Sequence, residues 1–193
     1  KMNPPINSVK TEQLLERLAS LMRSKTRVSL IAHGLLPVQF EALHYLSRCN
    51  RYSDSPMAVV EYLGQTKGTV SQTLKILEKK GLLQKSTDTA DKRVKHLKIT
   101  AEGRALVGQI LPSPLLETAA GLMGQNQLST VNTVLTELLR TLQRANQSKT
   151  FGQCGTCQHN ITEPTGGHIC GLTKEPLSVI DVSLICLEHE HKN

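Results

Sequence analysis

Four cysteines in the C-terminal region are the residues of this chain best suited to bind a metal. Cys154, Cys157, Cys170 and Cys186 follow the pattern Cys-x2-Cys-x12-Cys-x15-Cys within 33 residues. Thiolates are soft ligands that suit zinc and iron–sulfur clusters. Four of them complete a tetrahedral zinc site or bind the four irons of a cubane cluster. The spacing therefore predicts a metal centre in this region.

Two kinds of metal centre fit this pattern. Structural zinc sites often pair two Cys-x2-Cys knuckles, whereas this chain has one, Cys154 to Cys157. A single knuckle followed by two isolated cysteines resembles small high-potential-type iron–sulfur domains, such as those in accessory subunits of benzylsuccinate synthase. On that spacing we favour a [4Fe-4S] cluster, and Zn²⁺ stays open as the alternative.

Other residues bear on this prediction. Four histidines nearby could replace a thiolate as zinc ligands: His159, His168, His189 and His191. A lone histidine in a polar tail is more often simply exposed, and a disordered tail with free thiols is a further alternative. Cys49 stands apart from the four. We expect it to be a small buried hydrophobic residue, with a reactive sensor thiol as the alternative.

A second group of polar side chains is suited to contact double-stranded DNA. On a predicted helix near residues 66–80 the outward residues are Lys67, Thr69, Ser71, Gln72 and Lys75. Gln pairs bidentately with adenine, Lys reaches guanine acceptors, and Ser or Thr takes either role. On a predicted hairpin that follows, the basic residues are Lys92, Arg93, Lys95 and Lys98. They would neutralise phosphates, and an arginine at the tip could enter the minor groove. The alternative is an amphipathic helix with an ordinary polar face.

The distribution of charge agrees with a polyanionic partner for one half of the chain. Residues 1–100 hold 17 Lys/Arg against 8 Asp/Glu, whereas residues 101–193 hold 6 against 8. A basic half beside a mildly acidic half favours nucleic acid as the partner of the first half, and a solvated basic surface is the alternative. With no Trp, two Phe and three Tyr, a base-stacking platform for single strands is not expected.

The elements that would position these side chains form a helix-turn-helix. Ser55 followed by Pro56 is a typical helix N-cap with proline at the first helical position. A short helix should run over residues 57–63, and a second from Thr66 or Gly68 to Lys80. Gly81 suits a left-handed C-cap. Two helices joined by such a turn indicate a helix-turn-helix, whose second helix enters the major groove.

A basic hairpin and flanking helices complete the predicted architecture. Apolar and polar residues alternate over 94–99, after a polar tip at 87–92, so residues 82–100 should form a β wing. Helical periodicity predicts further helices over residues 10–31, 38–48, 101–111 and 128–145. Pro112 and Pro114 must kink or split the segment that follows residue 101. The last helix has an apolar stripe too wide to face water. It should pack on residues 14–22 of a second chain, with an intramolecular bundle as the alternative.

The sequence resembles the MarR family of bacterial transcriptional regulators. The resemblance is carried by residues 69–83 (TVSQTLKILEKKGLL), by Asp91-Lys-Arg93 and by residues 97–103 (LKITAEG). It covers residues 10–147. It implies a two-fold dimer built from the first and last helices, bound to a pseudo-palindromic operator, with Asp91 and Arg93 shaping the wing. Members often bind small phenolic or lipophilic ligands between the DNA-binding and dimer lobes. The interruption by Pro112 and Pro114 departs from the family pattern.

The sequence thus predicts a mainly α fold with a small β wing, in three regions. These are a flexible arm (1–9), a MarR-like domain (10–147) and a cysteine-rich tail (148–193). Within the domain, residues 35–100 form the winged helix-turn-helix, and residues 10–32 and 101–147 form the dimerisation helices.

The predicted function is a sequence-specific regulator, a homodimeric repressor on double-stranded DNA whose tail senses redox or iron status. The tail would act through the last dimer helix, which it follows directly. The alternative is a regulator that responds to a small-molecule effector, with a structural zinc or partner-binding tail. The sequence shows no Ser/His/Asp constellation and no phosphate-binding glycine loop, so we do not expect the protein to be an enzyme. With no signal peptide or long apolar run, we expect a cytoplasmic protein without a membrane span.

Overall fold

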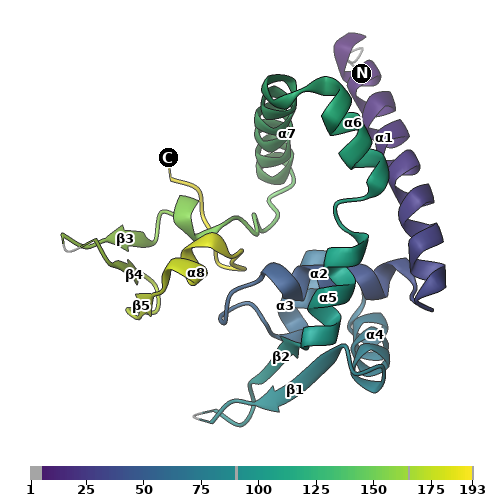
Figure 1. Cartoon of the computed structure of the whole chain (residues 1–193). Helices are drawn as coiled ribbons and strands as arrows, with labels where there is room; N and C mark the ends of the chain where they lie inside the picture. The colour runs from purple at the N-terminus through teal and green to yellow at the C-terminus, as the bar shows by residue number, and fades with distance from the viewer. Residues whose placement is uncertain (1–5, 90, 165, 193) are drawn as a thin grey trace, which may run out of the picture.

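The order of helices and strands confirms the predicted mainly helical fold with a small β wing. The computed structural model describes residues 6–89, 91–164 and 166–192 (Figure 1). The first half contains α1 (Ile6–Ala32), α2 (Pro37–Arg48), α3 (Pro56–Leu63), α4 (Lys67–Lys79), β1 (Leu83–Thr87) and β2 (Lys95–Ile99). The middle contains α5 (Ala101–Ile110), α6 (Pro114–Met123) and α7 (Gln125–Ala145). The tail contains a 3-10 turn (Cys154–Thr156), β3 (Asn160–Thr162), β4 (His168–Cys170), β5 (Pro176–Leu177) and α8 (Val179–Ser183).

Helix α2 lies at the centre of the winged helix-turn-helix. It contacts α3, α4, α5 and β2. Its residues Phe40, Leu43 and Tyr45 are buried among apolar side chains from those elements. The partners include Val59, Val70, Leu74, Leu77, Leu83 and Leu97. Each such side chain stabilises the fold by about 1.5–3 kcal/mol when it leaves water. This common core sets the angle between α3 and α4.

Local capping fixes where the two helices of the motif begin and end. The Ser55 hydroxyl accepts a hydrogen bond from the Ala58 amide, and the Thr66 hydroxyl accepts one from the Thr69 amide. Gly81 follows α4 with φ of +71°, the left-handed conformation that favours glycine. The predicted N-caps and the glycine at the end of α4 are therefore confirmed.

The prolines after α5 split the helical segment, as predicted. Helix α5 ends at Ile110, and α6 begins at Pro114 with Ser113 as its N-cap. Gly124 ends α6, and α7 begins directly after it at Gln125 rather than at residue 128. Three helices, α5, α6 and α7, therefore lie between the wing and the tail in the described residues, where helical periodicity predicted two, over residues 101–111 and 128–145.

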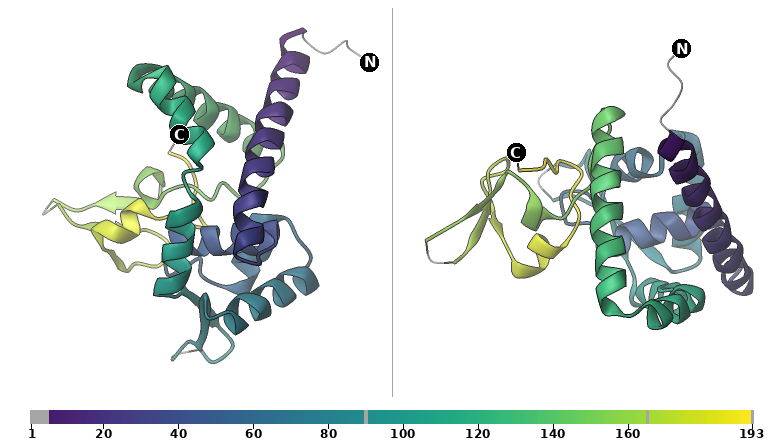
Figure 2. Two further views of the ribbon diagram at one scale, coloured as in Figure 1. Left: turned by 45° about the vertical axis from the view of Figure 1, so that its right-hand side comes forward. Right: turned by 90° about the horizontal axis from the view of Figure 1, so that it is seen from above.

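The long helices α1 and α7 stand apart from each other (Figure 2). Helix α7 packs against α6 and makes no extensive contact with α1. Leu14 and Leu18 of α1 and Leu139 of α7 are more than half exposed. The alternative of an intramolecular bundle between the two helices is therefore wrong within the described residues.

The predicted arm is also shorter than expected. Helix α1 begins at Ile6, and the Thr11 hydroxyl donates a hydrogen bond to the Asn7 carbonyl oxygen inside it. Residues 6–9 are thus helical, because no proline interrupts them. The rest of the predicted arm, residues 1–5, lies outside the described residues.

Two glycines in α5 differ sharply in their surroundings and provide a test of the core. A Cβ at Gly103 would lie 2.4 Å from the Leu82 carbonyl oxygen and 2.8 Å from Cγ1 of Ile99, whereas one at Gly108 would meet nothing within 4 Å. We expect Gly103→Ala to lower the free energy of unfolding by about 1–3 kcal/mol, the usual cost of overpacking. The matched control Gly108→Ala should raise it by up to about 1 kcal/mol, since alanine favours helices. Urea denaturation measures both, and equal effects would contradict this packing.

Candidate nucleic-acid interface and four-cysteine cluster

Helix α4 presents the predicted base-reading residues to solvent. Val70, Leu74 and Leu77 anchor it in the core. Lys67, Thr69, Ser71, Gln72 and Lys75 are all exposed. The first turn is held by Thr66, whose hydroxyl also pairs with the Thr69 hydroxyl at 3.0 Å. The outward side of α4 is thus an unobstructed polar surface on a rigid helix.

The wing places the predicted basic residues on one exposed hairpin. Strands β1 and β2 pair antiparallel, with Leu83 opposite Ile99 and Thr87 opposite Lys95. Leu97 and Ile99 point into the core. Lys92, Arg93, Lys95 and Lys98 are exposed.

The wing tip is shaped by an ion pair between Asp91 and Arg93. Arg93 donates from Nε and Nη2 to the Asp91 carboxylate at 3.0 and 2.8 Å, and its amide donates to Asp91 Oδ1 at 2.9 Å. These hydrogen bonds lower the pKa of Asp91. The Arg93 side chain is 90% exposed. This pair agrees with the wing-shaping role that the family resemblance implies.

A histidine that the sequence placed on the outer side of the strand in fact anchors the wing. His96 Nδ1 lies 2.7 Å from Asp54 Oδ1, and His96 Nε2 lies 3.2 Å from Asp88 Oδ2. The Leu97 amide donates to the Asp54 carbonyl oxygen at 2.8 Å. The hydrogen bond to Asp54 raises the pKa of His96, and burial raises the pKa of Asp54. Asp54 therefore ties the α2–α3 loop to the wing, which the alternation pattern did not reveal.

The tail docks against the same loop through its backbone. Ile185 donates from its amide to the Arg48 carbonyl oxygen at 2.9 Å and accepts from the Asn50 amide at 2.9 Å. It thereby forms a parallel bridge beside Cys49. The Leu187 amide donates to the Ser53 hydroxyl at 2.8 Å. These bonds hold the tail on the loop that joins α2 to α3.

Side chains extend this contact between the tail and the loop. Arg51 pairs with Asp181 at 3.1 Å and donates to the Pro176 carbonyl oxygen, while the Tyr52 hydroxyl donates to Glu175 at 2.6 Å. At the start of the tail, the ring of Phe151 packs edge-on against Tyr45 and Tyr62. Figure 1 shows the tail beside α3, away from α1. The tail thus contacts the winged helix-turn-helix directly, which offers a second route besides the predicted one through α7.

The structure brings the four predicted cysteines to one place. They line a common cavity of about 20 Å³ together with Asn50 and Tyr52 of the loop. Burial, and then the other three thiols, raise the pKa of Cys154 to about 11. Within the described residues, no three His, Cys, Asp or Glu side chains are arranged to hold a metal ion. The convergence of the thiols is thus observed, whereas a bound metal stays a prediction.

Cys49 and two of the histidines that the sequence offered as metal ligands have distinct surroundings. Burial raises the pKa of the half-buried Cys49 to about 12, which favours the packing role over a reactive thiol. His189 is 2% exposed and bonds to Thr150 and Thr156, so the expectation of an exposed histidine is wrong there. His159 lines the thiol cavity, and its Nε2 makes no hydrogen bond but lies 3.5 Å from Glu190 Oε2.

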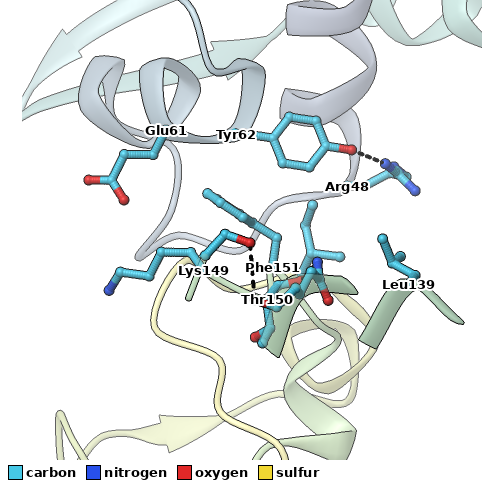
Figure 3. A pocket seen from close by; sticks show the side chains of 10 residues that line it. Arg48, Glu61, Tyr62, Leu139, Lys149, Thr150 and Phe151 are labelled. Atoms are coloured by element: carbon cyan, nitrogen blue, oxygen red, sulfur yellow. Dashed lines mark hydrogen bonds between the residues drawn. The ribbon is translucent and has the colours of Figure 1, made fainter. Parts of the chain in front are cut away.

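A larger pocket of about 530 Å³ lies between the winged helix and α7 (Figure 3). Arg48, Tyr62, Leu139, Lys149 and Phe151 are among its lining residues. The Arg48 guanidinium donates to the Tyr62 hydroxyl at 3.0 Å. The pocket thus combines the rings of Tyr62 and Phe151 with two cations, Arg48 and Lys149, and one acidic residue, Glu61.

The His96 ion pairs predict how the stability of the wing depends on pH. A raised pKa means that the charged imidazole stabilises the fold fully below its ordinary value of 6.5. That stabilisation is lost as the pH rises through the higher pKa of the folded state. We expect His96→Gln to lower the free energy of unfolding by up to about 1 kcal/mol at pH 6 and by less at pH 9. The exposed His33→Gln is the control, and a pH-independent loss in His96→Gln would contradict the ion pairs.

Comparison with known proteins agrees with this geometry. Residues 33–94 match the model of the MarR family. The transcriptional regulator Tm0710 from Thermotoga maritima is 25% identical, with a TM-score of 0.53 over 72% of this chain and 99% of its own.

Two structures of MepR from Staphylococcus aureus are also similar in fold. The structure in the DNA-binding conformation is 24% identical, with a TM-score of 0.58 over 69% of this chain and 98% of its own. The structure of the MepR–DNA complex is 23% identical, with a TM-score of 0.55 over 67% of this chain and 96% of its own.

None of the described helices is both long enough and apolar enough to span a membrane. The match to the MarR family model and the similarity to the regulator Tm0710 agree with the prediction that the chain is not an enzyme. Residues 33–94, which hold α2, α3, α4 and β1, thus match the MarR family model, and together with β2 they form a winged helix-turn-helix.

Proposed function

We propose that this chain is a transcriptional regulator that binds double-stranded DNA through α4 and the wing. The observation that carries the proposal is the exposed polar side of α4 next to a hairpin with four exposed cations. A helix of this kind reads base edges in the major groove, and wing cations contact phosphates. The fold is shared with MepR, which has been solved in complex with DNA.

We also propose that two copies of the chain form the DNA-binding unit. Along α1, Leu14, Leu18, Leu21 and Met22 are exposed, and along α7 Val134, Leu135, Leu139 and Leu142 are exposed. Apolar stripes of this width are covered by another helix in stable proteins. A second copy would cover both and place two α4 helices on a pseudo-palindromic operator. Such a dimer would act as a repressor where its operator overlaps a promoter.

A second candidate function is a response to a small effector. The pocket of about 530 Å³ is within the usual size range for ligand sites. Arg48 is placed to bind a carboxylate, and Tyr62 and Phe151 to contact a ring. Lys149 is already paired with Glu188 at 2.7 Å, and Glu61 also lines the pocket, so Arg48 would be the main anion contact. Because the pocket joins α7 to the winged helix, a bound aromatic acid would alter the position of one relative to the other.

Substitutions on α4 and on the wing should have different effects on DNA binding. We expect Gln72→Ala to lose about 1–3 kcal/mol of discrimination at one base pair while non-specific affinity is kept. We expect Lys98→Ala to weaken binding to all sequences alike. It should also make the slope of log K against log salt concentration less steep by about 1. Selection from a random duplex library, followed by salt titrations, measures both. If both variants lost the same affinity and both kept the sequence preference, this assignment of base reading to Gln72 and phosphate binding to Lys98 would be contradicted.

The proposed dimer predicts that a charge on the apolar face of α7 separates the copies. We expect Leu135→Glu to give monomers at micromolar concentration, because a buried unpaired carboxylate costs several kcal/mol. Thr133→Glu, on the opposite face of α7, is the matched control and should leave the mass unchanged. Sedimentation velocity measures the mass of each variant. A wild-type monomer, or a dimeric Leu135→Glu, would refute this interface.

A further inference from the structure

The cysteine cavity is held in shape by backbone hydrogen bonds from within the tail. The Cys157 amide donates to the Cys154 carbonyl oxygen at 3.1 Å, the Cys170 amide to Glu175 at 2.9 Å, and the Cys186 amide to Gly152 at 3.0 Å. Four thiols that are up to 32 positions apart in sequence are thus held around one space. All four cysteines are free, and their thiols line the same cavity. A cavity lined by four thiols offers soft donor atoms to a metal.

The size of the cavity separates two classes of metal centre. In a zinc tetrathiolate each Zn–S distance is about 2.3 Å, so the sulfurs lie about 3.8 Å apart and leave no room for a water-sized sphere. Here the four thiols surround about 20 Å³, which is enough space for such a sphere. No three potential ligands among the described residues are arranged to hold a metal ion. The space between the thiols is therefore larger than one tetrahedral ion requires.

A four-iron cluster fits this donor set. Each thiolate binds a different iron of the cube, so four cysteines can stand further apart than around one ion. Leu177, which is 7% exposed, and Leu172, which is 51% exposed, contribute apolar walls, and the buried one suits a cluster partly shielded from water. Glu188 also lines the cavity, but its carboxylate is paired with Lys149 at 2.7 Å. His159 also lines the cavity, with its Nε2 3.5 Å from Glu190 Oε2.

The DNA-binding domain closes one side of this cavity. Asn50 and Tyr52 belong to the α2–α3 loop, and both line the space between the thiols. The amide of Asn50 bonds to Ile185, the residue before Cys186. Farther along the same loop, Asp54 holds His96 and the Leu97 amide of the wing. A path of hydrogen bonds and adjacent residues therefore runs from Cys186 through Ile185, Asn50, Ser53 and Asp54 to the wing.

We infer that Cys154, Cys157, Cys170 and Cys186 bind an iron–sulfur cluster of the four-iron class, and that its binding orders the α2–α3 loop and the wing. The effect of this ordering on operator binding rests on the proposed function, whereas the cluster and the ordering do not. Binding of metal and local folding are coupled, because the ligands gain their fixed positions together. The cluster would thus act through residues 49–54 in addition to any effect through α7.

The test is anaerobic reconstitution of the full chain with iron salts, sulfide and a thiol reductant, with Zn²⁺ alone in a parallel sample. We expect a brown protein with about four irons and four sulfides per chain. Cys170→Ser should lose most of this content. The matched control Cys49→Ser should keep it, because Cys49 does not line the cavity. Circular dichroism of both variants checks that they fold.

Three outcomes would overturn the cluster assignment. These are a colourless protein after reconstitution, one tightly bound zinc that iron and sulfide cannot replace, and full iron content in a folded Cys170→Ser. A zinc protein that loses its metal when His159 is replaced by Ala would identify a mixed thiolate–histidine site instead.

Hydrogen–deuterium exchange on the same samples tests the ordering without DNA. We expect at least five-fold slower exchange over residues 49–54 and 91–99 in the loaded protein, within the usual range of coupling between sites. Exchange that slows only in residues 150–190 would overturn the link to the wing while leaving the cluster in place. If both results hold and no duplex is bound, the proposed function fails and this inference stands.

Discussion

The buried face of α2 is the constraint on which the rest of the molecule depends. Tyr45 lies fully buried on that face, and its hydroxyl donates to the Ser53 carbonyl oxygen at 2.7 Å. Its ring contacts Tyr62 of α3 and Phe151 of the tail. One side chain thus joins the helix-turn-helix, the α2–α3 loop and the start of the tail. A buried aromatic ring contributes both area and a fixed geometry, so a shift of α2 would disturb all three.

The two halves of the chain differ in charge, and the contact between them uses that difference. The winged helix carries the excess of cations, while the tail supplies Glu175 and Asp181 to Arg51. Partly exposed ion pairs of this kind contribute little free energy. The backbone bridge at Ile185 and the packing of Phe151 hold the tail more strongly. The cations that face outward on α4 and the wing are left available for a polyanion.

The α2–α3 loop contacts two candidate sites that are separate in the sequence. On one side it lines the space between the four thiols, and on the other it holds His96 of the wing. In a winged helix the hairpin and the recognition helix must contact DNA together. A loop that is bonded to both the wing and a cysteine-rich tail is therefore well placed to make DNA binding depend on the state of the tail.

The sequence by itself determined the local elements and the chemistry of the candidate sites. Helix ends could be predicted at Ser55, Thr66 and Gly81 because each acts locally. The two hydroxyls accept hydrogen bonds from amides in the first turn, and glycine adopts the left-handed conformation after the last turn. The alternation at Leu97 and Ile99 and the spacing of the four cysteines are likewise local patterns. Only the tertiary structure decided where the tail docks, because Ile185 meets Arg48 and Asn50 across more than 130 residues of intervening chain. It also turned His96 inward to Asp54 and Asp88, since ion pairs between distant segments leave no periodic trace in sequence.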